Sequence, residues 1–271
     1  MTDETPDPGL PPGADTSVPH SARIWNYWLG GRLNYPVDRA AGDAYQQAYP
    51  QIVDVALASR AFQTRAVRFL AGEAGITQFL DVGAGLPATE NTHEIAQAID
   101  PAARVLYVDH DPFVVAYGRG QLSSTAAGSA GFIEGDLHQP AAILSAAART
   151  LDLTRPVGLL LMGVMGHLAE TDAYPVVAHL VAALPGGSYL ALQDGTSSGT
   201  EAFDEAQDEY DDTGALPYHL RRPEQIAAFF DGLDLVEPGV VPLTRWRPEP
   251  GQPGPVDLPN VGGVGRKPNG R

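Results

Sequence analysis

The stretch from Ile76 to Asn91, Ile-Thr-Gln-Phe-Leu-Asp-Val-Gly-Ala-Gly-Leu-Pro-Ala-Thr-Glu-Asn, predicts a strand, a glycine turn and the start of a helix. The strand, Gln78 to Val82, is a short apolar run with one carboxylate, Asp81, and it ends at Gly83-Ala84-Gly85. Glycines permit a sharp turn and leave no Cβ between the main chain and a ligand, and N–H groups that open a helix face the same space. A nucleotide-like ligand is one interpretation of this turn. An ordinary connection between a strand and a helix is the other, because a lone G-x-G is common.

The composition indicates a globular protein with a sizeable core. The chain has 271 residues, of which 44% are hydrophobic, enough for one large domain or one domain with an appendage. Its 33 acidic and 17 basic residues give a net charge of −16. This charge repels a phosphate backbone, so we expect no nucleic-acid partner.

Some residue types are rare, and this excludes several kinds of site. The chain has no cysteine, which excludes disulfides, thiolate metal sites and a cysteine nucleophile. Its one lysine, Lys267, lies near the C-terminus, so a mechanism that needs a core lysine is unsupported. No apolar run reaches the roughly 18 residues of a membrane span, and no signal peptide is visible. We therefore expect a cytoplasmic protein with no membrane partner.

The sequence suggests three segments. Residues 1–18 are rich in proline and polar residues and are predicted to be a disordered tail. Residues 19–75 contain helical patterns near 21–29, 38–49 and 51–71 and are predicted to form an N-terminal helical lid or cap. Residues 76–271 are predicted to form the main α/β domain.

Aromatic residues are concentrated in the first helical pattern, beside polar ones. Trp25, Tyr27 and Trp28 accompany Arg23 and Asn26, and together they make candidate lid residues over an organic ligand. The alternative is that Trp25 and Trp28, three positions apart, dock this helix on the core. We favour docking for these two.

Strands alternate with helices after residue 76, which predicts one open, mainly parallel sheet. Further strands are expected at residues 104–108, 131–134, 156–162, 188–193, 235–236 and 261–266. The acidic segment 201–212 is predicted to be an exposed helix face, and we expect no metal site because its carboxylates lack the spacing of a binding loop.

Aspartates follow three consecutive strands. Asp81, Asp109 and Asp136 therefore share one edge of the predicted sheet. Asp109 lies 24 residues after Gly85 and is a candidate acceptor for ribose hydroxyls, with a helix N-cap as its alternative role. The three carboxylates suit S-adenosylmethionine, which offers an ammonium group, a ribose diol and an adenine amine.

Two further residue patterns bear on function. Gly83, Gly85 and Ala88 satisfy G-x-G-x-x-A, so a NAD(P)-binding oxidoreductase is an alternative, although Asp81 would repel a pyrophosphate. His167 follows the strand at 156–162 and is the candidate catalytic base, with a capping or core role as the alternative.

Several motifs resemble those of class I S-adenosylmethionine-dependent methyltransferases. They are Leu-Asp-Val-Gly-Ala-Gly at 80–85, Tyr-Val-Asp at 107–109 and Gly-Asp-Leu at 135–137. The closer resemblance is to a bacterial, chiefly actinobacterial, S-adenosyl methyltransferase family formerly described as a domain of unknown function. It rests on residues 23–31 and 38–42, 81–87 with 91–94, 107–112 and 263–268, nearly the whole chain.

This resemblance implies a Rossmann-like, doubly wound α/β fold with a seven-stranded sheet. It implies S-adenosylmethionine as cofactor, bound at Asp81, Gly83, Ala84, Gly85, Asp109, His110, Asp136, Leu137, Met162 and Gly163. The expected reaction is methylation of an oxygen or nitrogen of a small molecule, with His167 as base. A catalytically silent S-adenosylmethionine-binding protein is the alternative, and a homodimer is left open.

Overall fold

The computed structural model of the chain describes residues 15–88, 90–197, 201–249 and 256–270. Of the predicted tail, residues 1–14 therefore lie outside the described residues. Residues 15–18 are described, and they contact the fold, because the main-chain carbonyls of Asp15 and Val18 accept hydrogen bonds from Arg23.

The described residues form one sheet of eight strands in a mixed but mostly parallel arrangement. Its main path has the order β3-β2-β1-β4-β5-β8-β6, and β7 pairs with β8. The first five strands are parallel, and β8 is antiparallel to β5, β6 and β7. The predicted α/β fold is thus confirmed, and the short β7 adds a strand to the seven that were expected. The bounds are β1 Gln78–Val82, β2 Arg104–Asp109, β3 Ser129–Glu134, β4 Gly158–Met162, β5 Tyr189–Gly195, β6 Asp234–Leu235, β7 Val241–Pro242 and β8 Asn260–Arg266.

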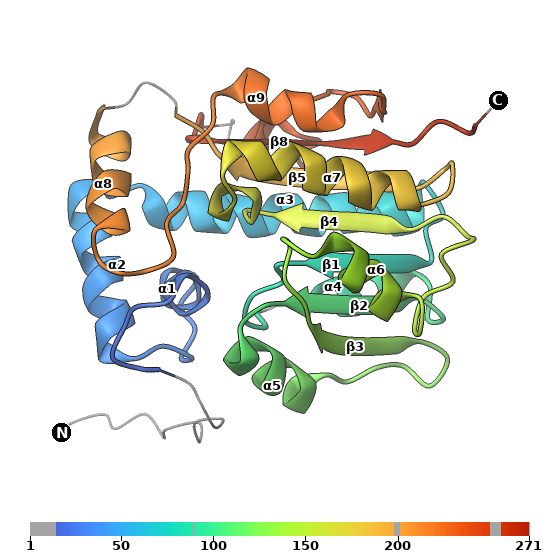
Figure 1. Cartoon of the computed structure of the whole chain (residues 1–271), viewed down its shortest axis with the longest axis horizontal. Helices are drawn as coiled ribbons and strands as arrows, with labels where there is room; N and C mark the ends of the chain where they lie inside the picture. The colour runs from blue at the N-terminus through green and yellow to red at the C-terminus, as the bar shows by residue number, and fades with distance from the viewer. Residues whose placement is uncertain (1–14, 89, 198–200, 250–255, 271) are drawn as a thin grey trace.

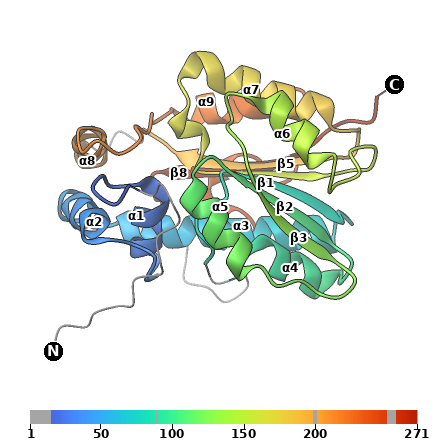
Figure 2. The ribbon, with the colours of Figure 1, turned by 60° about the horizontal axis from the view of Figure 1, so that its bottom comes forward.

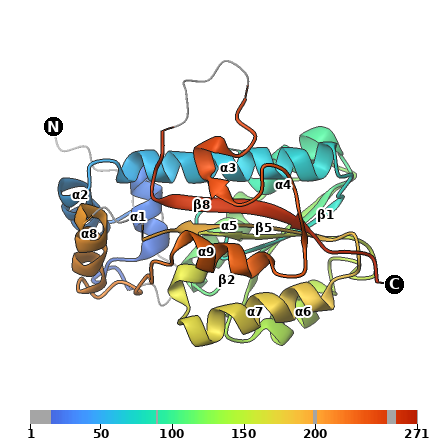
Figure 3. The ribbon, with the colours of Figure 1, turned by 90° about the horizontal axis from the view of Figure 1, so that it is seen from above.

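Helices cover both faces of the sheet (Figures 2 and 3). One face carries α3 (Ile52–Gly72), α4 (Thr92–Ile99) and α5 (Pro112–Gln121). The other carries α6 (Pro140–Ala147), α7 (Glu170–Ala183) and α9 (Pro223–Ala227). Each layer of helices buries its own apolar cluster against the sheet. The central strands β1 and β4 are therefore covered on both faces, and their sequences are mostly apolar. The helix predicted to follow the glycine turn is α4, and it begins at Thr92.

Three helices stand together beyond the carboxyl ends of the parallel strands (Figure 1). They are α1 (Ser21–Trp28), α2 (Pro36–Ala48) and α8 (Glu201–Asp211). The predicted acidic helix is present as α8, and it also buries Phe203, Ala206 and Tyr210 in a third apolar cluster with α1 and α2. Short 3-10 turns follow β4 (Met165–His167), α9 (Ala228–Phe230) and β7 (Leu243–Arg245).

A buried ion pair joins α1 to α2. Nε of Arg23 lies 3.0 Å from the carboxylate of Asp38, and both side chains are buried. The same carboxylate accepts hydrogen bonds from the main-chain N–H groups of His20 and Tyr35. Arg23, predicted from the sequence as a lid residue, therefore holds the N-terminal segment and the two helices together.

None of the helices in the described part of the chain is both long and apolar enough to span a bilayer.

We expect Asp38→Asn to lower the free energy of unfolding by about 3–5 kcal/mol, because it leaves the buried Arg23 guanidinium without its counter-charge. Urea unfolding followed by tryptophan fluorescence measures this. The control is Asp43→Asn on the exposed side of α2, where the carboxylate accepts a hydrogen bond from the Tyr27 hydroxyl. The free energy of unfolding of this variant should stay within about 0.5 kcal/mol of the wild-type value. Equal effects of the two substitutions would contradict the role of the pair.

Candidate functional site

The glycine turn brings the loops after β1, β2 and β4 together. Gly83 has φ of +71° and Gly85 of +65°, a region that favours glycine. The N–H groups of Gly83 and Ala84 donate to the carbonyl of Val108 in β2, at 2.8 and 3.1 Å. A Cβ on Gly83 would collide with the side chain of Val164, just after β4. The missing side chain therefore allows these loops to meet.

A cavity of about 130 Å³ lies over this meeting point, and we call it the central cavity. The strand ends supply Asp81, Gly83, Ala84, Gly85, Asp109, His110, Met162 and Gly163, all of which were predicted cofactor residues. Helix α1 supplies Trp25 and Asn26, and His167 also lines the cavity. The structure thus brings most of the predicted site residues to one place.

Asp81 is buried in the floor of the site, with 2% of its surface exposed. Its Oδ2 accepts hydrogen bonds from Oγ1 of Thr92 at 2.7 Å and from Nε2 of Gln63 at 3.2 Å. Burial raises the pKa of Asp81 to about 6, although these hydrogen bonds and the charge of Arg60 oppose the shift. At neutral pH the group is mainly a carboxylate, and it titrates just below that range.

Asp109 is held by the glycine turn itself. Its Oδ2 accepts a 2.9 Å hydrogen bond from the N–H of Gly85, and its Oδ1 accepts one of 3.0 Å from the N–H of Asp111. Burial raises its pKa above the ordinary value, against these two bonds. The predicted alternative role falls to Asp111, which caps α5 through the N–H of Phe113.

Asp136 lies at the same edge of the sheet but does not line the central cavity. Its side chain is 48% exposed and accepts hydrogen bonds from the N–H and the ring of His138. Burial acts to raise its pKa, but the two bonds from His138 outweigh it and lower the pKa. Leu137 is buried in the apolar cluster under α6 and also lies outside the lining. Two of the three aspartates therefore share the cavity.

Helix α3 contributes residues that the sequence analysis did not assign to the site. Ser59, Arg60 and Gln63 line the central cavity. Arg68 of the same helix lies at the surface, where it pairs with Glu90 and Glu249. Arg60 instead donates from Nη1 to Gln63, and its charge faces Asp81. Ser59 and Gln63 are polar residues four positions apart within the apolar stripe of α3. In the sequence, this interruption of the stripe could have indicated that α3 contributes to the site.

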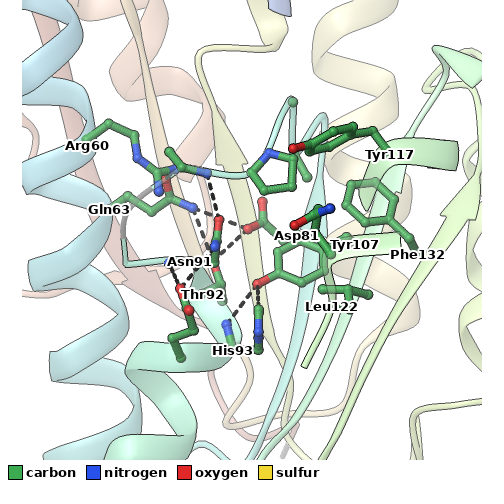
Figure 4. A pocket seen from close by; sticks show the side chains of 16 residues that line it. Arg60, Gln63, Asp81, Asn91, Thr92, His93, Tyr107, Tyr117, Leu122 and Phe132 are labelled. Atoms are coloured by element: carbon green, nitrogen blue, oxygen red, sulfur yellow. Dashed lines mark hydrogen bonds between the residues drawn. The ribbon is translucent and has the colours of Figure 1, made fainter. Parts of the chain in front are cut away.

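A second cavity, of about 290 Å³, lies behind the glycine turn, and we call it the lateral cavity (Figure 4). Arg60, Gln63 and Asp81 border it as well as the central cavity. Figure 4 shows Gln63 and Thr92 meeting Asp81 from one side, while the hydroxyl of Tyr107 faces His93. The network under the turn is thus polar and largely satisfied, and it fixes the orientation of Asp81.

A third cavity, of about 50 Å³, lies between the sheet edge and the helices α1, α2 and α8, and we call it the aromatic cavity. Its walls include Trp25, Trp28, Tyr45, Phe203 and Tyr210. The aromatic and central cavities share Ser21, Trp25, Gly163 and His167. They are therefore neighbouring compartments that meet at the end of β4.

His167 stands at this junction with a defined orientation. Its Nδ1 lies 2.9 Å from the carbonyl oxygen of Pro217, and a carbonyl only accepts, so Nδ1 carries the hydrogen and Nε2 has the free lone pair. Tyr218 packs edge-on against the ring at 5.0 Å. Burial lowers the pKa of His167 to about 4. The imidazole is therefore neutral at physiological pH.

The candidate lid residues of α1 divide into two groups. Trp25 and Asn26 line the central cavity, and Trp25 and Trp28 line the aromatic one. Trp28 also docks the helix, because its Nε1 donates to the carbonyl of Gly42 and its ring packs on Tyr45. Asn26 orders the turn after α1 by accepting from the N–H of Leu33. Arg23 and Tyr27 line none of the three cavities.

We expect Gly83→Ala to destabilise the protein by about 1–3 kcal/mol, because alanine is strained at positive φ and its Cβ would displace Val164. Gly120→Ala is the matched control. Gly120 lies in α5, with open space where the added methyl group would lie, so a gain of up to about 1 kcal/mol is expected. Thermal and urea unfolding of both variants measure the difference. A stable Gly83→Ala protein would show that the two loops need no such close contact.

Comparison with known proteins gives a family and two similar structures. A family model described as S-adenosyl methyltransferase matches residues 9–268. The structure of a DUF574 family protein from Streptomyces avermitilis is 42% identical, with coverage of 94% of this chain and 99% of that one and a TM-score of 0.90. The structure of a proposed methyltransferase from Thermobifida fusca is 37% identical, with coverage of 97% and 100% and a TM-score of 0.89.

More distant comparisons add only the fold. A SAM-dependent methyltransferase from Anabaena variabilis is 12% identical, with coverage of 84% of this chain and 95% of that one and a TM-score of 0.53. No curated protein matches the chain in sequence.

Proposed function

This chain belongs to the S-adenosyl methyltransferase family, and we propose that it methylates an oxygen or nitrogen of a small-molecule acceptor held in the aromatic cavity. The observation that supports this proposal is the neutral, oriented His167 between two neighbouring cavities. The family is one of methyltransferases, so the oxidoreductase alternative is wrong. Binding of S-adenosylmethionine at the glycine turn is part of this proposal.

The residues around the central cavity offer groups that complement the charged and polar groups of S-adenosylmethionine. Gly83 and Gly85 present main chain without a Cβ at the strand end. Asp81 would attract the ammonium of the methionine part, and Asp109, with both oxygens already positioned, would accept from the ribose hydroxyls. Arg60 supplies a cation for the carboxylate of the methionine part.

The bound cofactor supplies an electrophilic methyl carbon, whose bond to sulfur breaks with the electron pair remaining on sulfur as the acceptor atom forms its new bond. The protein aligns the acceptor with that carbon, which is a large part of the rate enhancement of such a displacement. The proton that the acceptor loses passes to Nε2 of His167. Nδ1–H remains bonded to Pro217 and holds the ring in place for this transfer.

Asp81 makes cofactor binding depend on pH. Its pKa of about 6 implies that in most protein molecules Asp81 is a neutral carboxyl at pH 5 and a carboxylate at pH 7. The α-amino and α-carboxyl groups of the cofactor's methionine part keep their charges over that range. Affinity should therefore rise roughly tenfold from pH 5 to pH 7 as the ionised fraction grows.

Calorimetric titration with S-adenosylmethionine at both pH values measures this rise. Asp81→Asn, which cannot ionise, should bind weakly at both and lose the rise. If the affinity of Asp81→Asn still rises tenfold from pH 5 to pH 7, a group other than Asp81 causes the pH dependence.

His167→Asn tests the proposed function, because asparagine retains a donor for Pro217 and lacks the base. Release of S-adenosylhomocysteine with a panel of hydroxylated and amino acceptors should be detectable for the wild type, and kcat should fall by about 10²–10⁴ in the variant. Cofactor affinity should stay within about threefold, since the ring's proton transfer contributes nothing to binding. His179→Asn, on the exposed face of α7, is the matched control and should retain full activity.

An unchanged kcat in His167→Asn would remove the base assignment. Binding of S-adenosylmethionine with no release of S-adenosylhomocysteine from any acceptor would favour the silent binding protein.

A further inference from the structure

We propose that the methyl acceptor is a single hydroxylated aromatic ring that carries a second hydrogen-bond donor and no carboxylate or phosphate. This inference rests on the proposed function, because it takes the aromatic cavity as the acceptor site. It follows from the walls, the polar atoms, the charge and the size of that cavity.

The walls are aromatic and already packed in fixed positions. Trp28 meets Tyr45 edge-on at 5.4 Å, Tyr45 meets Tyr210 at 5.9 Å, and Trp25 meets Trp28 at 5.8 Å. These contacts hold α1, α2 and α8 together in one apolar cluster. A flat ring gains from edge-to-face and offset packing against such walls, beyond the gain from its burial.

Two acceptor atoms at this cavity are available to a ligand that donates hydrogen bonds. Nε2 of His167 has its lone pair free, as described above. Asn260 lines the cavity with 1% of its surface exposed, and its Nδ2 donates to the carbonyl of Val55 at 3.3 Å. Its Oδ1 is buried and has no hydrogen-bond partner among the described residues. A buried acceptor without a hydrogen bond is unfavourable, and a ligand that donates to it relieves that cost.

Two polar side chains of the wall, Tyr218 and Gln193, already have hydrogen-bond partners. The hydroxyl of Tyr218 donates to Asp194 at 2.8 Å and accepts from the N–H of Gly195 at 3.1 Å. Nε2 of Gln193 donates to Oγ of Ser59 at 2.7 Å. The cavity therefore offers an acceptor to two donors of a ligand, one at His167 and one at Asn260.

Charge excludes an anionic acceptor. Among its described lining residues the cavity has no arginine, lysine, aspartate or glutamate. Behind the wall lie two acidic groups, Asp194 on Tyr218 and Asp211, which accepts from Nε2 of Gln207 at 2.8 Å. Arg221 is also near, but its guanidinium donates to main-chain carbonyls of Met165 and Leu168 and does not line the cavity. A carboxylate would be buried there without a counter-charge.

The depressed basicity of His167 favours oxygen as the reacting atom. A weak base takes a proton only from a stronger acid. A hydroxyl becomes a strong acid as its oxygen binds the methyl carbon, so its proton passes readily to the imidazole while the carbon–sulfur bond breaks toward sulfur. An aliphatic ammonium is a weaker acid than imidazolium, so His167 would leave such an amine protonated and unreactive.

The small size of the cavity disfavours any acceptor larger than one ring. Its volume of about 50 Å³ is below the roughly 150 Å³ of a cavity known to take up benzene. Even one ring therefore requires a small shift of a wall side chain, and a fused ring system is unfavourable. His167 lines both cavities, so a hydroxyl that reaches its Nε2 lies at the border with the central cavity.

A matched panel tests the inference on the wild type. The probes are the three dihydroxybenzene isomers, phenol, and 3- and 4-hydroxybenzoate. With S-adenosylmethionine, at least one dihydroxybenzene should have a kcat/KM about tenfold or more above that of phenol, because only it satisfies Asn260. The hydroxybenzoates should give no measurable turnover. Equilibrium binding to the protein with S-adenosylhomocysteine, followed by quenching of Trp25 and Trp28, should show the same order.

Asn260→Leu removes the second acceptor at similar volume. It should lower kcat/KM and affinity for the preferred dihydroxybenzene about tenfold, to the level of phenol, and leave phenol within about threefold. The control is Asn269→Leu, at an exposed position after β8, which should change neither. If Asn260→Leu does not fold, the order of the probes on the wild type decides alone.

The outcomes separate this inference from the proposed function. Equal use of phenol and all dihydroxybenzenes, or preference for a hydroxybenzoate or an aliphatic amine, would overturn the inference while release of S-adenosylhomocysteine upholds the function. Selective binding of a dihydroxybenzene without any turnover would uphold the ligand class inferred for the aromatic cavity and contradict the proposed methyl transfer. If no aromatic probe binds and none is turned over, the inference is overturned.

Discussion

The close contact between Gly83 and Val164 is the constraint on which the site depends. Because Gly83 has no Cβ and adopts a positive φ, the loop after β1 packs directly against the loop after β4 and bonds to the end of β2. Parallel strands already direct their carboxyl ends to one edge of the sheet. The contact turns that edge into a single cavity bordered by Asp81, Asp109 and His167.

Burial then sets the chemistry of the groups at this edge. Desolvation favours the neutral form of each, so it raises the pKa of Asp81 to about 6 and lowers that of His167 to about 4. The carboxylate keeps its charge at neutral pH with the help of Thr92, Gln63 and Arg60. The histidine keeps a free lone pair. One region of the site therefore suits a cation, and the adjoining region suits the acceptance of a proton.

Much of this arrangement could be predicted from local sequence. Apolar runs that end in glycine or aspartate identified the parallel strands, and the spacing of Asp81 and Asp109 placed both at one edge. Long-range packing could not be read in the same way. Arg23 was assigned to the lid, but its role is set by Asp38, fifteen residues away. The tautomer of His167 depends on Pro217. Arg60 resembles its surface neighbours in the sequence, and only the packing of the glycine turn beside α3 sets it apart.

The crystal structure of the protein with S-adenosylhomocysteine tests the central claim most directly. The account predicts electron density in the central cavity, with the amino-acid end between Asp81 and Arg60, the ribose at Asp109 and the sulfur directed toward His167 and the aromatic cavity. Density confined to the lateral cavity, or a central cavity closed by side chains while the ligand binds elsewhere, would contradict it.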